Sequence, residues 1–282
     1  MSADQAINIL VTITLIQLMV TIGLGVMFAD VARVARNWGL VVRAALANFV
    51  LVPLATVGLL SLFHAPPLVA AGFLVAAVCP GAPYRPPFAA MAKGNLPISI
   101  GLMVMLAGSS AIVAPLLLHL LLSGTSGEEL PSVDLGRIVG TLLLTQLIPL
   151  GVGLAVRHYR RDLADRLRKP ANWLSVALNL AVFGLIVGVD FNLLASISVV
   201  GFEAMLVLVI VAVAAGWLLG GRGADQRKAM AFSTGARNVS VSLVIVTANF
   251  PATPAVTAVL AYALLQTAVL ALLAAAWGRW AC

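Results

Sequence analysis

Charged residues are scarce in this chain, and their scarcity excludes most classes of protein. Asp, Glu, Lys and Arg make up 10% of the 282 residues, whereas a soluble globular domain carries about 25%. The two cysteines, Cys79 and Cys282, are too few for a disulfide scaffold. Hydrophobic residues instead reach 62%, and the mean hydropathy is +1.08. The composition therefore predicts an all-α membrane protein that crosses the bilayer many times.

Long stretches without a charged residue mark the predicted spans. A spanning helix needs roughly 20 apolar residues, and prolines or short polar stretches divide the longest stretches. We expect a single membrane domain over residues 1–282 with nine spans, of which the third and the eighth are broken. The nine predicted spans are 7–28, 39–62, 68–93, 97–121, 138–156, 171–189, 199–219, 229–249 and 254–277.

The basic residues gather on one side of these spans. That side holds Arg33, Arg36, Arg43, Lys93, Arg157, Arg160, Arg161, Arg166, Arg168, Lys169, Arg222, Arg227, Lys228 and Arg279. Basic loops stay in the cytoplasm, so we expect the N-terminus outside and the C-terminus in the cytoplasm. The brevity of the chain and the lack of targeting extensions indicate a bacterial inner membrane. The formal net charge of +7 then reflects topology, and we expect no nucleic-acid partner.

The predicted span 68–93 is interrupted near its middle. The string CPGAPYRPP places Gly81 and four prolines there. A proline inside a helix removes a backbone hydrogen bond, so we expect two half-helices, the second of which opens at Pro86 and Pro87.

The predicted span 229–249 is interrupted as well, by Gly235, Arg237 and Asn238 in the string FSTGARNVSVS. Asn238 is a good N-cap for a second half-helix. When span 138–156 is left out, the broken span is third in each set of four, and the two sets run in opposite directions. This inverted repeat is typical of secondary transporters, whose broken helices mark the substrate site. Two ordinary kinks are the alternative.

Arg85 and Arg237 are the only fixed charges that we predict deep in the membrane. A central arginine costs about 2.5–3.5 kcal/mol on insertion scales, and no acidic residue lies near either in sequence. Glu203, inside a predicted span, either pairs with one of them or lies at the interface. Arginine binds carboxylates through two parallel hydrogen bonds. We therefore expect the pair to face a cavity and to bind a small organic anion; snorkelling to the surface is the alternative.

At these two strings the chain resembles the bile acid:sodium symporter family, within the bile/arsenite/riboflavin transporter group. The matching motifs are Cys79-Pro80-Gly81, Ala92-Lys93-Gly94-Asn95, the Ser99 helix that ends in Ala114-Pro115-Leu116, and Gly235 with Asn238 in STGARN. The resemblance covers the whole chain in span order. It implies the nine-span form of the fold, with a panel domain, a core domain and broken helices that cross in the core.

The resemblance also implies two sodium ions beside the crossing, and the chain departs from that pattern. The positions that correspond to the family's sodium ligands are Asn48, Arg85, Pro86, Ser99, Met103, Ser233 and Arg237. Ser99 keeps the family's serine, whereas Arg85-Pro86 replaces Ser-Asn. Ser233 replaces a glutamate that both sodium sites share, and Met103 replaces a threonine. Arg237 and Asn48 stand where the family has glutamines, so the chain loses the carboxylate and gains a guanidinium on each side.

Our hypothesis is that the arginines take the place of the two sodium charges. We then expect a sodium-independent secondary transporter of a small organic anion, with no metal site, no cofactor and no enzyme activity. The anion would meet Arg85 and Arg237, with the panel rocking against the core to give alternating access. Polar contacts are expected from Asn48, Ser99, Ser233, Thr234, Asn238 and Ser240.

Other functions remain open at the level of sequence. A sodium-coupled symporter, an arsenite-type exporter that uses Cys79, and an anion sensor that does not transport are all compatible with the motifs. Neither motif has an acidic residue or a histidine beside it, so proton coupling, exchange and facilitated diffusion are equally open. The chain has no HExxH, no G-x-S-x-G and no Walker A motif, which argues against an enzyme or a primary pump.

Overall fold

The computed structural model describes residues 3–125, 135–195 and 199–279, and these ranges contain helices and no strand. Cys282 lies outside the described residues. The α-helices are α1 (Ala3–Gly25), α2 (Phe28–Ala35), α3 (Trp38–Leu46), α4 (Val52–Leu62), α5 (Pro67–Val78), α6 (Arg85–Met91), α7 (Leu96–Thr125), α8 (Leu135–Leu142), α9 (Ile148–Tyr159), α10 (Arg161–Ala195), α11 (Val199–Leu219), α12 (Ala224–Gly235), α13 (Val239–Asn249) and α14 (Pro254–Arg279). The π-helical turns η1 (Ala47–Leu51) and η2 (Leu143–Leu147) join α3 to α4 and α8 to α9.

Seven helices of the described chain are long and apolar enough to cross a membrane. They match seven of the predicted spans, and the protein is a polytopic helical membrane protein. The two remaining predicted spans each consist of a pair of short helices, α5 with α6 and α12 with α13. The apolar helices α5 and α13 have 12 and 11 residues, fewer than the roughly 20 that a crossing needs.

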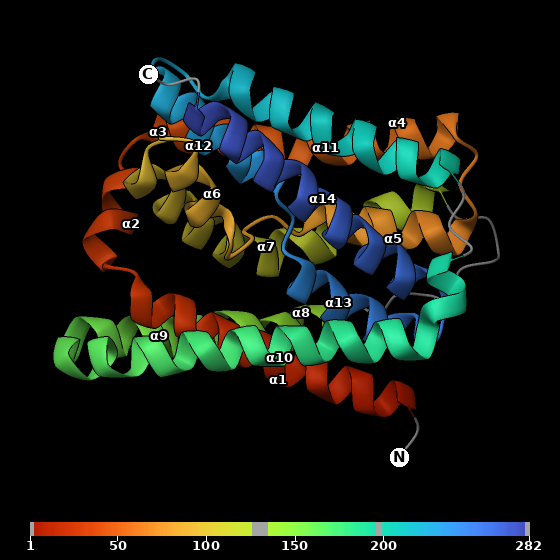
Figure 1. Cartoon of the computed structure of the whole chain (residues 1–282), viewed down its shortest axis with the longest axis horizontal. Helices are drawn as coiled ribbons and strands as arrows, with labels where there is room; N and C mark the ends of the chain where they lie inside the picture. Colours follow the sequence, from red (N-terminus) through yellow and green to blue (C-terminus); the bar gives the residue numbers. More distant parts are fainter. Residues whose placement is uncertain (1–2, 126–134, 196–198, 280–282) are drawn as a thin grey trace.

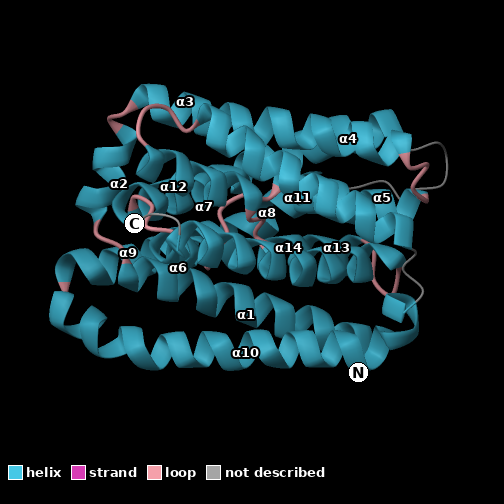
Figure 2. Ribbon diagram, turned by 45° about the horizontal axis from the view of Figure 1, so that its top comes forward, coloured by secondary structure: helices cyan, strands magenta, loops and turns pink. Residues whose placement is uncertain are grey.

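The helices lie in two layers, which α2 connects (Figure 1). We call α1, α8–η2–α9 and α10 the first layer, and α3–η1–α4, α5–α7 and α11–α14 the second layer. Figure 2 shows α1 and α10 side by side in the first layer. A Cβ atom at Gly23 would lie 2.5 Å from the carbonyl oxygen of Leu150, so α1 and α9 touch through their backbones, as small residues allow in membranes. Gln17 also donates to the carbonyl of Ala171 on α10 (3.2 Å).

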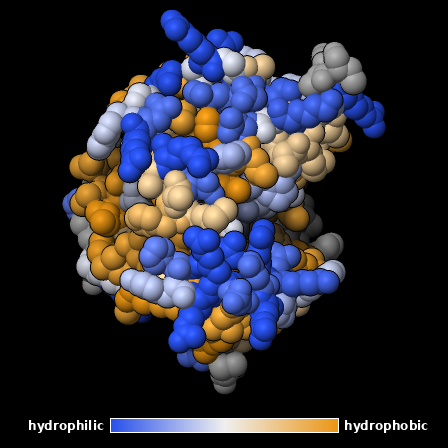
Figure 3. All heavy atoms as spheres, turned by 90° about the vertical axis from the view of Figure 1, so that its left-hand side faces the viewer, coloured by the Kyte–Doolittle hydropathy of each residue, from blue (hydrophilic) through white to orange (hydrophobic). Residues whose placement is uncertain are grey.

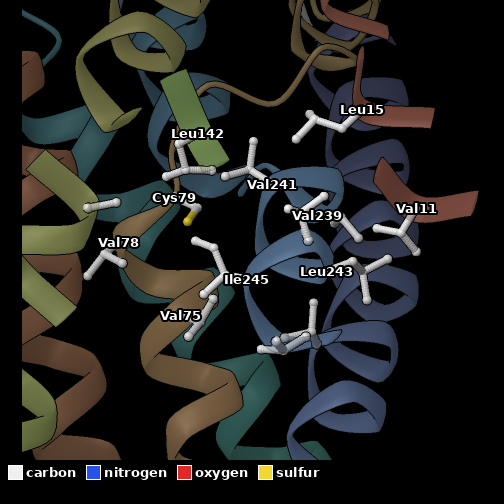
Figure 4. Close-up of a cluster of buried hydrophobic side chains, with 14 of the residues drawn as sticks. Val11, Leu15, Val75, Val78, Cys79, Leu142, Val239, Val241, Leu243 and Ile245 are labelled. Carbon is white, nitrogen blue, oxygen red and sulfur yellow. The ribbon is translucent and has the colours of Figure 1, made fainter. Parts of the chain in front are cut away.

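Helix α13 lies on the side of the second layer that faces α1, and aliphatic side chains of α1 and α5 pack against it. Val239, Val241 and Leu243 belong to a buried cluster with Leu15 of α1 and Val75 of α5, as Figure 4 shows. Helix α13 exposes no face to water, because every residue from Val239 to Thr247 is buried. Burial on all sides is expected for a short helix enclosed by others.

Hydrophilic side chains gather on the face where α2, α6 and α9 end (Figure 3). Exposed arginines on this face include Arg33 and Arg36, which follow α1, and Arg160 and Arg161, which separate α9 from α10. Lys228 is different, because it is 91% buried: its exposed fraction is 9%. The asymmetry agrees with the expected orientation, which itself stays a prediction.

Candidate functional site

The breaks in the two short-helix pairs meet each other inside the second layer. We call the non-helical residues 79–84 and 236–238 together the crossover. Pro80 and Arg237 form an antiparallel bridge, and the backbone N–H of Asn238 donates to the carbonyl of Cys79 (2.7 Å). Backbone groups freed by a broken helix must find partners within a membrane protein. Here the two breaks supply those partners to each other.

Local sequence explains both ends of the crossover. Gly81 has φ +95°, and a Cβ there would lie 2.5 Å from the backbone nitrogen of Ala107, so only glycine fits without strain. Helix α6 begins at Arg85 with prolines in its first turn, as predicted from Pro86 and Pro87. The side chain of Asn238 caps α13 by accepting from the N–H of Val241 (3.4 Å), which confirms the predicted N-cap.

Oxygen atoms from three elements surround the guanidinium of Arg237. Its Nη1 donates to the carbonyl of Ala77 at the end of α5 (3.1 Å). Its Nη2 donates to Oδ1 of Asn48 in η1 (2.9 Å) and to the carbonyl of Thr234 at the end of α12. The side chain is 1% exposed. Two helix C-termini, which carry partial negative charge, thus point at one buried cation.

Arg85 lies in a similar environment and is fully buried. Its Nη1 donates to the carbonyl of Ser233 near the end of α12 (2.8 Å), and its Nε donates to the carbonyl of Ala82 (3.1 Å). Within the described ranges neither arginine forms an ion pair, and Glu203 is exposed near the start of α11. Of the two alternatives for Glu203, pairing with one of these arginines is therefore not the one found in the described chain.

The expectation that the arginines face a cavity and bind an anion stays a prediction. A cavity of about 340 Å³ opens among α4, α5, α11 and α14, but neither arginine lines it. Its walls are mostly apolar and include Leu60, Phe73 and Met205. The guanidinium groups are instead closed off because their N–H groups turn toward main-chain carbonyls. The snorkelling alternative fails for the same reason.

Several buried polar atoms of the described chain have no hydrogen-bond partner. They include Arg85 Nη2, Arg237 Nε, Ser99 Oγ, Ser233 Oγ and Tyr262 Oη. Each of these atoms carries a hydrogen that it can donate. Buried polar groups are normally paired, and the two guanidinium nitrogens in this set, which can only donate, lack an acceptor.

Of the remaining predicted site residues, Thr234 contacts an arginine of the crossover and the others lie elsewhere in the second layer. Thr234 contributes its carbonyl to Arg237, while its hydroxyl donates to the carbonyl of Met230 (3.0 Å). Ser240 lies in the first turn of α13 with 8% of its surface exposed, and no contact described above involves it. Met103 packs in the apolar cluster around α13, and Pro86 is buried in α6.

Sequence reasoning missed the residue that fastens the backbone of Arg237. Gln266 of α14 is fully buried. Its Oε1 accepts from the backbone N–H of Arg237 (2.9 Å), and its Nε2 donates to the carbonyl of the same residue (3.3 Å) and to Tyr84 Oη (2.6 Å). Tyr84 Oη in turn donates to that carbonyl (3.0 Å). A glutamine inside a long apolar span was the signal that could have revealed it.

Lys228 is a further buried cation that the sequence placed only among topology residues. Its Nζ donates to the carbonyl of Ala92 (2.7 Å), which ends α6, and to the carbonyl of Trp277 of α14 (3.4 Å). Arg85 of α6 reaches α12 and Lys228 of α12 reaches α6. The two short helices are therefore joined reciprocally by cations that donate to backbone oxygens.

Comparison with known proteins agrees with this architecture. The sequence profile of the Sodium Bile acid symporter family matches residues 12–197, which is more than half of the chain. The chain is 26% identical over 247 residues to the uncharacterized sodium-dependent transporter YocS of Bacillus subtilis (strain 168), covering 85% of this chain and 74% of that protein. It is 24% identical over 263 residues to the hepatic sodium/bile acid cotransporter of Rattus norvegicus, covering 89% and 70%.

Proposed function

The chain belongs to the sodium bile acid symporter family, and from that premise we propose that it is a secondary transporter which moves a small organic anion without bound sodium. The family is one of transporters and not of enzymes. In our proposal the first layer is the panel and the second layer is the core of a nine-span inverted repeat. The panel rocks against the core in an inner membrane, with the N-terminus outside.

The observation that carries the sodium-independent part is the position of the two guanidinium groups. In broken-helix transporters, unwound carbonyls and half-helix C-termini coordinate the coupling cation. Here the carbonyls of Ala77, Thr234 and Ser233 already accept hydrogen bonds from Arg237 and Arg85. A sodium ion would have to displace these donors and approach two fixed positive charges. The names of both relatives mention sodium, and we propose that this chain differs from them.

The unpartnered donors support an anionic substrate. Arg85 Nη2, Ser99 Oγ and Ser233 Oγ are buried without an acceptor, and no carboxylate of the described chain is paired with either arginine. A carboxylate would supply two acceptor oxygens and one negative charge. We propose that opening of the layers lets the anion reach these donors, with Asn48, Asn238 and Ser240 as further polar contacts.

Counterflow in liposomes tests the proposal. A thermal-shift screen of small carboxylates first selects a stabilising anion, and its labelled form is then exchanged by the purified protein in sodium-containing and in choline-containing buffer. We expect equal exchange in the two buffers. A steep loss of exchange in choline would refute sodium independence, and binding without any exchange would indicate a sensor instead of a carrier.

A further inference from the structure

Gln146 is a buried carboxamide that the proposed function leaves unused. It is fully buried and lies in η2, in the middle of a helix of the first layer. The other π-helical turn in the described ranges, η1, holds Asn48, whose carboxamide contacts Arg237. Both turns precede a proline, Pro149 or Pro53. Such π-helical turns occur frequently at functional sites, and Gln146 lies in the first layer in the same kind of turn that holds Asn48 in the second.

The contacts of Gln146 cross from the first layer to the second. Its Nε2 donates to the carbonyl of Ala107 and to Ser110 Oγ (3.1 Å) on α7. Gly81 of the crossover packs against the backbone of Ala107. A Cβ atom at Gly81 would lie 2.5 Å from the backbone nitrogen of Ala107. Gln146 therefore binds the same segment of α7 against which the crossover packs.

Only one end of this carboxamide is satisfied. Oε1 of Gln146 is buried and has no hydrogen-bond partner. An amide that is fully paired would resist separation of the layers, whereas one with an unpaired acceptor gains a partner when the interface opens to water or ligand. The arrangement suits a contact that forms and breaks in each cycle.

We propose that Gln146 is a latch between the two layers, which holds this closed arrangement at mid-membrane and releases when the layers move apart. The inference rests on the proposed alternating access. Gln146 is a positioning residue in this account, because it acts through α7 and the crossover. A longer bond, from Asn8 of α1 to Thr247 of α13 (3.4 Å), joins the layers elsewhere and does not reach α7.

Distance measurement between the layers tests the latch without any ligand. Spin labels are attached at Tyr159→Cys of α9 and Leu218→Cys of α11, whose side chains are 79% and 77% exposed, in a Cys282→Ser background. Double electron–electron resonance in nanodiscs then compares Gln146→Leu with Gln17→Leu. The control removes a glutamine that bonds α1 to α10 within one layer.

We expect Gln146→Leu to add a second distance between the layers, while Gln17→Leu keeps the wild-type distribution. An unchanged distribution in Gln146→Leu overturns the latch, and so does an equal change in both variants. If Gln146→Leu fails to fold, Ser110→Ala removes one of its two bonds and should shift the distribution the same way; no shift there overturns the latch. Failure of the transport proposal would appear separately, as absent counterflow in the wild-type protein.

Discussion

Arg237 has its oxygen partners on three separate elements, so no short stretch of sequence could have revealed them. Asn48, Ala77 and Thr234 reach it from η1, α5 and α12. A lysine would carry the same charge, but all its N–H groups belong to one nitrogen. The planar guanidinium of Arg237 donates to the three oxygens from two separate nitrogens. The identity of this residue as arginine, and not only its charge, is what the site requires.

Arg237→Lys is therefore expected to destabilise the protein. At least one buried acceptor loses its donor, which costs about 1–3 kcal/mol. Thermal unfolding in detergent measures the effect, with Arg33→Lys as the control because the Arg33 side chain is 68% exposed. Equal stability of the two variants would show that the three oxygens around Arg237 do not require a guanidinium.

Gln266→Leu is expected to lower stability more than Tyr84→Phe. The leucine leaves the backbone N–H of Arg237 without its carboxamide partner, whereas the phenylalanine removes a single hydroxyl. Because both residues bond to the same carbonyl, the double variant should be less destabilised than the sum of the two. Unfolding of the four proteins of this cycle gives the answer, and strict additivity would show that the two residues act independently.

Helix breaks were the elements that sequence could predict best. Proline and glycine act locally, so the strings around Gly81 and Gly235 indicated both interruptions and the N-cap at Asn238. Helix ends were harder to predict where a helix continues into a charged stretch outside the expected span. The basic stretch after Tyr159 was predicted to precede a span from residue 171, but α10 already begins at Arg161, because arginine, lysine and leucine are good helix formers outside the membrane too.

At the level of elements, Gly81→Ala is expected to disrupt the crossover. Alanine at φ +95° is strained, and its Cβ would meet the backbone of Ala107 at 2.5 Å, where no flexible side chain can move aside. The matched control is Gly58→Ala in α4, where nothing lies within 4 Å and helix propensity improves. The yield of monodisperse protein after purification should fall for Gly81→Ala only; similar yields would argue against the close approach to α7.

The sequence could predict the class of fold of the whole molecule, but not which helix faces contact each other. Composition and charge-free stretches indicated a polytopic helical protein, and the family resemblance predicted the crossing in one layer. The contacts of Gln146 join residues 36 or more apart in sequence, and those of Gln266 join residues 29 or more apart. Apolar spans resemble one another too closely for periodicity to specify which faces meet, so these contacts required the structure.

The molecule as a whole should not respond to sodium. A ligand that binds only the folded state raises the unfolding temperature by mass action. We therefore expect the same unfolding temperature in sodium chloride and in choline chloride at equal ionic strength. The double variant Ser233→Glu with Arg237→Gln returns two positions to the residues implied by the family resemblance, and it serves as a comparison that should gain a sodium response. A sodium-dependent rise in the wild-type protein would contradict the proposal.

A positive charge that is part of the polypeptide cannot leave on the far side of the membrane. Arg85 and Arg237 therefore supply no downhill ion flux, and in the proposed sodium-independent carrier sodium does not drive accumulation of the cargo. For a monovalent anion, an interior-negative voltage of 100 mV contributes about 2.3 kcal/mol in favour of efflux. If no other ion is coupled, the proposed carrier would therefore favour release or exchange of an acid over its accumulation.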